Sequence, residues 1–284
     1  MIQNAVSKDP LLQPFQLKSL RLKNRVISTS HAISYGVGGK PMERYQRYHE
    51  EKAKGGIGMT MFGGSSNIDV DSASVFGQLY IGDDDIIPVF QQFSDRIHKY
   101  DCALMCQITH IGRRTTAFGD NWLSPIAPSR VRETLHRCFP REMDMDDIQR
   151  VVKSFGDAAW RCKEGGLDGC EVIAASHLVG QFLSPYTNHR TDEFGGSLEN
   201  CARFGMMVFD EIRNRVEDDF IVGMRMPAHE GGEDGLLLDE SIQVAQIFEA
   251  VGTVDFFNLN SGRMDTELAL DERYMQACRA SSPL

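Results

Sequence analysis

Residues 161–174 read RCKEGGLDGCEVIA, a polar stretch that ends in two glycines and passes at once into an apolar run. A glycine at that point is typical of a helix end, where the backbone turns left-handed, and the apolar run is typical of a buried strand. Residues 51–62 (EKAKGGIGMTMF) repeat this arrangement, and residues 247–260 (IFEAVGTVDFFNLN) repeat it with a single glycine. The sequence therefore predicts a fold built from repeated helix-to-strand units.

Six strands and five helices are expected when this pattern is followed along the chain. The strands are predicted at 25–30, 57–62, 103–108, 169–174, 220–225 and 254–260. The helices are predicted at 42–54, 86–99, 144–164, 197–216 and 239–251. Asp144 is placed to cap the third helix, and Lys163 lies in its last turn. Strands and helices that alternate in this way are typical of a parallel sheet.

Parallel sheets occur as open, doubly wound sheets or as closed eight-stranded barrels. The open nucleotide-binding form normally has a G-x-G-x-x-G motif after its first strand, but residues 31–41 read HAISYGVGGKP and do not match it. Polar residues and glycines follow the strands instead, namely His31, Gly63, Gly64, Gln107, His110, His177, Arg225 and Asn260. In a TIM (β/α)8-type barrel these positions form one ring at the catalytic face, so an α/β barrel is predicted.

Composition restricts the function classes. The 284 residues suit one large domain or two ordinary ones, and a net charge of −10 argues against a nucleic-acid partner, because phosphate binding needs a basic surplus. The chain start does not resemble a signal peptide and no apolar run is long enough to span a bilayer, so no membrane contact is expected. The seven cysteines form no Cys-x-x-Cys pair, which predicts free thiols in a cytoplasmic protein and no metal site.

Residues 181–200 (QFLSPYTNHRTDEFGGSLEN) form an unusually long polar connection between a strand and a helix. They resemble the signature that follows the fourth barrel strand in the old yellow enzyme family of FMN oxidoreductases. Residues 107–114 (QITHIGRR) resemble its third-strand motif, and residues 10–31 resemble its hairpin-like opening segment. The resemblance runs from Pro10 to Arg263. Residues 52–66 and 191–204 resemble the branch that holds trimethylamine dehydrogenase, N-methyl amino acid demethylases and dienoyl-CoA reductase.

The resemblance implies an FMN site and assigns residues to it. Gln107 is expected at the N3/O2 edge of the flavin, where its amide offers a donor and an acceptor. Arg225 is expected at N1/O2, where a fixed positive charge stabilises a reduced flavin. Ser30 and His31 are expected at the N5/O4 edge, and Gly64 is expected to leave room for the flat ring.

Each of these residues also has a purely structural interpretation. Gln107 could cap a neighbouring strand end, and Arg225 could form a salt bridge on the barrel rim. The glycine pair at 63–64 could form a simple turn, and His31 could be a packed histidine on the rim. Both sets of interpretations stay open at this point.

His177 is the predicted catalytic residue. The resemblance places a histidine or tyrosine in the turn after the fourth strand, usually within a His-x-x-His/Asn-x-Tyr pattern. Residues 171–183 (EVIAASHLVGQFL) are one residue short of that pattern and keep one histidine. His177 could bind an anionic group or exchange a proton near neutral pH. His110 is expected to make a structural hydrogen bond.

Three positions depart from the family pattern. Ala32 stands where trimethylamine dehydrogenase carries the cysteine that holds its flavin, so non-covalent FMN is expected. Gly64 replaces an aromatic residue of that enzyme's amine cage, to which Trp122 or Tyr35 could contribute instead. Cys201 replaces an arginine at the junction between the long loop and the next helix.

The resemblance also sets the expected domain organisation. Family barrels continue through two further strands, whose loops bind the FMN phosphate, and larger members add an iron–sulfur segment and a dinucleotide-binding region. Residues 1–263 are therefore expected to form an incomplete FMN-binding barrel with six of the eight strands. Residues 264–284 are expected to form an atypical C-terminal tail without an iron–sulfur cluster. A homo-oligomer or a partner chain could complete such a barrel.

Three functions agree with these observations. The first is FMN-dependent oxidation of a small methylated amine or N-methyl amino acid, in which a hydride leaves the N-methyl carbon for flavin N5. The second is reduction of an activated alkene, with NAD(P)H as electron donor. The third is an inactive barrel that serves as a subunit or an interaction module.

Overall fold

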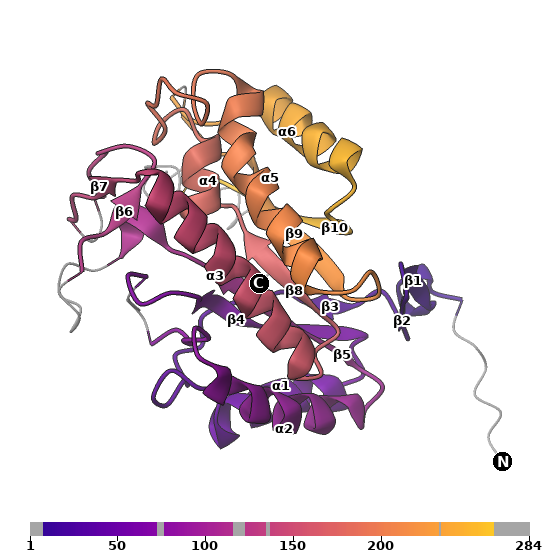
Figure 1. Ribbon diagram of the computed structural model, residues 1–284. Helices are drawn as coiled ribbons and strands as arrows, with labels where there is room; N and C mark the ends of the chain where they lie inside the picture. Colours follow the sequence, from indigo (N-terminus) through magenta and orange to yellow (C-terminus); the bar gives the residue numbers. More distant parts are fainter. Residues whose placement is uncertain (1–7, 73–76, 116–122, 135–136, 233, 264–284) are drawn as a thin grey trace, which may run out of the picture.

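A six-stranded parallel sheet forms the centre of the molecule (Figure 1). The computed structural model describes residues 8–72, 77–115, 123–134, 137–232 and 234–263, so the expected tail at 264–284 lies outside the described residues. The strands are β3 (Ile27–Ser28), β4 (Met59–Asn67), β5 (Ala103–Thr109), β8 (Gly169–Ile173), β9 (Ile221–His229) and β10 (Phe256–Ser261). They lie side by side in chain order and all pairs are parallel. The predicted incomplete α/β barrel with six parallel strands is confirmed.

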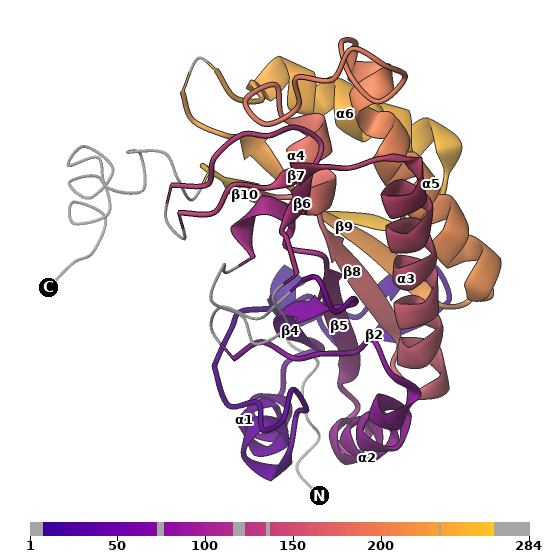
Figure 2. The ribbon, with the colours of Figure 1, turned by 60° about the vertical axis from the view of Figure 1, so that its left-hand side comes forward.

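Helices cover the outer face of this sheet. The five predicted helices are present as α1 (Glu43–Lys54), α2 (Ile87–His98), α3 (Met145–Glu164), α5 (Leu198–Arg215) and α6 (Leu238–Val251). α3 begins as predicted, because the carboxylate of Asp144 accepts the N–H of Asp147 at 2.9 Å. The side chain of Asp147 accepts the backbone N–H of Asp144, which completes a capping box. α3 and α5 lie side by side in both views (Figures 1 and 2). A short helix that the sequence analysis did not predict, α4 (Leu178–Leu183), follows β8.

Glycines end the helices that precede β4, β8 and β10. The second glycine of each pair takes the left-handed backbone, with φ of +93° at Gly56 and +72° at Gly166. The single glycine, Gly252, does the same at +74°. A residue with a Cβ is disfavoured at such angles, so the predicted reason for the glycines holds.

The sheet separates a large outer core from a small inner one. The outer core lies between the strands and the helices and is rich in phenylalanine. The inner core includes Met59, Ala103 and Ile221, the first residues of β4, β5 and β9. It is closed by the antiparallel hairpin of β1 (Phe15–Leu17) and β2 (Leu20–Leu22), which confirms the predicted opening segment. The hairpin therefore covers the inner core at the amino ends of the strands.

The remaining elements are short. They are the 3-10 helices η1 (Pro10–Leu12), η2 (Asp84–Ile86) and η3 (Gly112–Arg114), and the paired strands β6 (Ile126–Ala127) and β7 (Arg141–Glu142). Six described cysteines are buried free thiols. Among the described residues, no helix is both long and apolar enough to cross a membrane, and no cluster of His, Cys, Asp or Glu could hold a metal ion.

The long connection between α4 and α5 is held together by its own polar side chains. The Asn188 amide donates to the carbonyls of Phe182 and Phe194, both at 2.7 Å, and accepts the N–H of Arg190. Arg190 is paired with Asp192 and also donates to backbone carbonyls of residues 128 and 143. The polar block in this loop therefore supplies the hydrogen bonds that a regular element would otherwise provide.

Candidate active site

A cavity of about 360 Å³ lies at the carboxyl ends of the strands. Its volume is within the range of small-molecule and cofactor sites. The structure places all of the sequence-predicted site residues on its lining, namely Ser30, His31, Gly64, Gln107, His177 and Arg225. Parallel strands bring these residues together because their carboxyl ends meet at one edge of the sheet.

A bulge in β4 shapes one wall. The register of the pairing between β4 and β5 shifts between Phe62 and Ser66. The intervening residues, Gly63, Gly64 and Ser65, all have positive φ. A Cβ at Gly64 would lie 2.1 Å from the carbonyl carbon of His31, so glycine is required there by backbone packing. This reason differs from the expected one, which was room for a flat ring.

The Gln107 amide is oriented by its neighbours at the floor of the cavity. Its Oε1 accepts the backbone N–H of Ser65 at 3.1 Å, and its Nε2 donates to Glu171 at 2.7 Å. The other carboxylate oxygen of Glu171 accepts the amide of Asn258 at 2.8 Å. The bond to Ser65 is a structural contact with the backbone of the neighbouring strand β4, and one N–H and one lone pair of the Gln107 amide are left for a ligand.

Arg225 carries positive charge in the middle of β9. Its guanidinium donates to the carbonyl of Ser30 at 3.3 Å. It forms no ion pair with a described residue, so the alternative of a rim salt bridge is not observed. Arg225 is partly buried, and an electron-rich ligand edge in the cavity would give its guanidinium a further partner.

His177 lies buried at the start of α4. Its Nδ1 is 2.8 Å from the hydroxyl of Thr109. Burial lowers the pKa of His177 well below its ordinary value, and the charges of Arg114, His110 and Arg225 lower it further. The histidine is therefore neutral at physiological pH, which favours hydrogen bonding over the predicted alternatives of anion binding by charge and proton exchange near pH 7.

The other two histidines of the sequence analysis, His110 and His31, have different surroundings. His110 is buried and its Nε2 bonds Asp71 at 2.7 Å, while Arg150 bonds the same carboxylate. Burial alone would raise the pKa of Asp71, but these two partners lower it to about 2. His110 therefore has the structural role expected of it. His31 is exposed, and its Nε2 lies 2.8 Å from the hydroxyl of Tyr48.

Of the two aromatic residues considered for an amine cage, Tyr35 does not line the cavity. Tyr35 packs edge-on against Tyr48, with the guanidinium of Arg44 over its ring at 3.8 Å. Trp122 lies outside the described residues. Cys201, which replaces an arginine of the family pattern, is buried, and its Sγ accepts a hydrogen bond from the amide of Asn188 at 3.6 Å.

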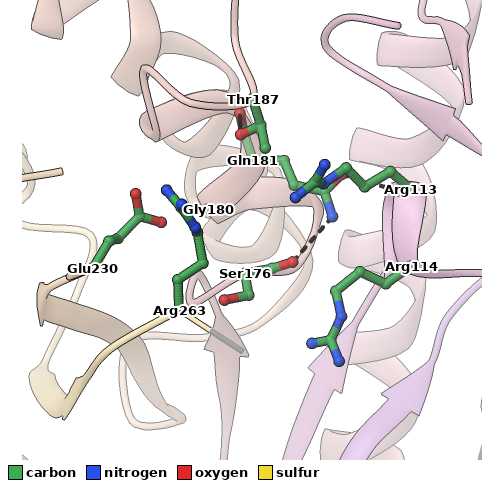
Figure 3. A pocket seen from close by; sticks show the side chains of 8 residues that line it. All are labelled: Arg113, Arg114, Ser176, Gly180, Gln181, Thr187, Glu230 and Arg263. Atoms are coloured by element: carbon green, nitrogen blue, oxygen red, sulfur yellow. Dashed lines mark hydrogen bonds between the residues drawn. The ribbon is translucent and has the colours of Figure 1, made fainter. Parts of the chain in front are cut away.

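A second, much smaller cavity adjoins the first one. It holds about 10 Å³, room for one water molecule, and shares Arg114 and Ser176 with the larger cavity. Figure 3 shows Arg113 and Arg114 on one side of it and Arg263 with Glu230 on the other. Arg113, Arg114 and Arg263 are all buried, so positive charge collects around this small cavity.

Tyr186 of the long loop contacts two of these arginines. The guanidinium of Arg263 lies 3.6 Å from the centre of its ring, and that of Arg113 lies 5.1 Å away. The long loop is thereby attached to the end of β5 and to the residues after β10.

Several lining residues were not predicted. They are Ala32, Ser65, Gln78, Arg114, Ile173, Ala175, Ser176 and Gly262. Arg114 is the last residue of the third-strand motif at 107–114, so its position in the sequence was an available signal. Ser176 has φ of +60°, a backbone conformation that no sequence pattern indicates for serine.

The cavity fits a flavin by its donors and acceptors. Gln107 and Arg225 supply the amide and the positive charge that a flavin edge requires. Ser30 Oγ and Asn260 Oδ1 are buried on the lining, and neither has a hydrogen-bond partner among the described residues. Buried polar atoms without partners are rare, and the polar edge of a bound flavin would satisfy them.

Comparisons with known proteins agree with this interpretation. Residues 10–267 match the model of the NADH:flavin oxidoreductase / NADH oxidase family. The chain is 54% identical over 264 residues to the multifunctional alkene reductase/demethylase OYE of Caballeronia cordobensis, covering 93% of this chain and 39% of that protein. It is 42% identical over 275 residues to a probable N-methylproline demethylase of Rhizobium meliloti, covering 97% and 41%.

Solved structures give the same result. Morphinone reductase in complex with tetrahydroNAD superposes with a TM-score of 0.79 and 26% identity, covering 89% of this chain and 74% of that one. The chain spans about two fifths of the length of the two curated relatives.

Proposed function

This chain belongs to the NADH:flavin oxidoreductase / NADH oxidase family, and from that premise we propose that it binds FMN non-covalently and oxidises an N-methyl amino acid. One observation carries the proposal: a single cavity collects Gln107, Arg225, Ser30 and Asn260, which complement a flavin edge. Non-covalent binding follows from Ala32, which offers no thiol.

The charges on the lining favour an N-methyl amino acid over a simple methylated amine. Two arginines, Arg114 and Arg225, line the cavity. Among the described lining residues there is no carboxylate and no phenylalanine, tyrosine or tryptophan, so a bare ammonium ion would find neither a counter-ion nor a cation–π cage. A substrate carboxylate beside the arginines would be matched.

The protein's own residues would orient such a substrate. Arg114 would bind its carboxylate, and the neutral ring of His177 would hydrogen-bond the substrate nitrogen without adding a second positive charge. FMN, when bound, supplies an acceptor for the hydride of the N-methyl carbon. The resulting iminium takes up water and separates into formaldehyde and the demethylated amino acid.

A paired substrate comparison tests this function. The FMN-loaded chain is mixed without oxygen with sarcosine, N-methylproline or trimethylamine, and loss of the oxidised flavin's visible absorption is followed. The proposal expects bleaching and formaldehyde with the two amino acids and a much slower reaction with trimethylamine. Bleaching by trimethylamine alone would contradict the assignment of substrate class.

Reduction of an activated alkene is a second candidate. It is favoured by the neutral state of His177, which suits a hydrogen bond to a carbonyl oxygen, and by the relative that is named for both reactions. Oxidation of NAD(P)H that depends on cyclohexenone, with no turnover of N-methyl amino acids, would decide for this candidate.

A further inference from the structure

Glu171 is a fully buried carboxylate that the proposed function does not use. It lies in the middle of β8 with none of its surface exposed. Its Oε1 accepts from the Gln107 amide at 2.7 Å, and its Oε2 accepts from the Asn258 amide at 2.8 Å. Both neighbours are donors, so the site is built for a group that only accepts hydrogen bonds.

The orientation of Gln107 follows from this arrangement. The backbone N–H of Ser65 can only donate, so the amide oxygen of Gln107 must face it. The amide nitrogen must then face Glu171. An ionised carboxylate satisfies both amides at once, whereas a glutamine at position 171 would place an N–H against one of them.

We propose that Glu171 is the positioning residue of the cofactor site, because its carboxylate fixes the Gln107 amide in the orientation that meets the flavin edge. This inference rests on the proposed FMN site but makes its own claim about hydrogen-bond polarity. Burial raises the pKa of Glu171, while the amides of Asn258 and Gln107 and the charge of Arg225 oppose that rise. These partners keep the acceptor-only form available.

Exchanging the carboxylate and the amide between positions 171 and 258 provides the test. Glu171→Gln turns a donor toward Gln107 or Asn258, and Asn258→Asp turns an acceptor toward Glu171. Each single variant therefore contains a mismatched pair. In the double variant, a glutamine at 171 accepts from Gln107 and donates to an aspartate at 258, so the polarity is restored with unchanged net charge. The 284-residue wild type and the three variants are compared.

Two measurements are made on these four proteins. FMN affinity is measured from the quenching of flavin fluorescence at a temperature where all four are folded. Each single variant is expected to bind about tenfold more weakly, and the double variant to return within about threefold of wild type. Thermal unfolding without FMN is expected to show the same pattern, with midpoints about 5 °C lower in the single variants.

A further comparison separates positioning from general support of the fold. If Glu171 acts through Gln107, then adding Glu171→Gln to Gln107→Met causes no further loss of FMN affinity. An equal loss in both backgrounds would overturn the positioning role. Single variants that melt and bind like wild type would overturn the polarity argument. If wild type takes up no FMN, the proposed function fails, and the melting pattern alone then supports or overturns the polarity of Glu171.

Discussion

Replacement of Asn188 by alanine tests how the long loop is held in place. Its side chain makes three hydrogen bonds with the backbone, two to carbonyls at 2.7 Å and one from the N–H of Arg190 at 3.1 Å. Alanine leaves these three backbone groups without their partner. At about 1 kcal/mol for each bond, Asn188→Ala is expected to lower the free energy of unfolding by about 3 kcal/mol.

Equilibrium urea unfolding measures this loss. With a slope of about 3 kcal/mol per molar urea, the midpoint should fall by about 1 M. Gln243→Ala is the matched control, because it removes one exposed amide hydrogen bond from the surface of α6 and should leave the midpoint nearly unchanged. If Asn188→Ala shifts the midpoint no more than the control does, the loop is not held by this side chain.

Three further predictions follow from single contacts. The hydrogen bond to Asp168 raises the pKa of His98 above its ordinary 6.5, so the stability it adds is present below that value and is lost as pH rises through the raised pKa. His98→Gln should therefore lower the melting temperature at about pH 5.5 and have less effect at about pH 8.5. The loss in the free energy of unfolding at the lower pH should be less than about 1 kcal/mol, because the side chain is 41% exposed. Gly64→Ala should cost about 3 kcal/mol or more in urea unfolding, whereas Gly38→Ala, with a similar positive φ and open space around it, should cost about 1 kcal/mol. His177 should stay neutral between about pH 5.5 and 8, so an NMR titration that shows its ring charging in that range would contradict its burial.

The regular elements could be predicted because local signals mark them. Apolar periodicity and left-handed glycines give the position of each helix and the strand after it, as at Gly166 and β8. Boundaries were less accurate. β4 continues to Asn67 instead of residue 62, because glycines and serines form a bulge that carries no strand signal, and β3 shrinks to residues 27–28.

Five of the six site residues could be placed at one edge because strand ends in a parallel fold converge, whereas Ser30 and the flavin roles came from the family resemblance. What the sequence did not indicate is how those residues are held. Glu171 reads as part of an apolar strand, and its partners lie 64 and 87 residues away. A usable signal was present in the register, since Gln107 and Glu171 are directly paired on neighbouring strands. Pairing can be inferred only after the strand order is known.

Uptake of FMN by the purified 284-residue chain tests the central claim most directly. The protein is mixed with excess FMN, freed of unbound flavin, examined by visible absorption and then precipitated with acid. We expect flavin absorption that stays with the folded protein and passes entirely into the acid supernatant. A colourless protein would contradict the FMN site, and flavin that remains in the pellet would contradict non-covalent binding.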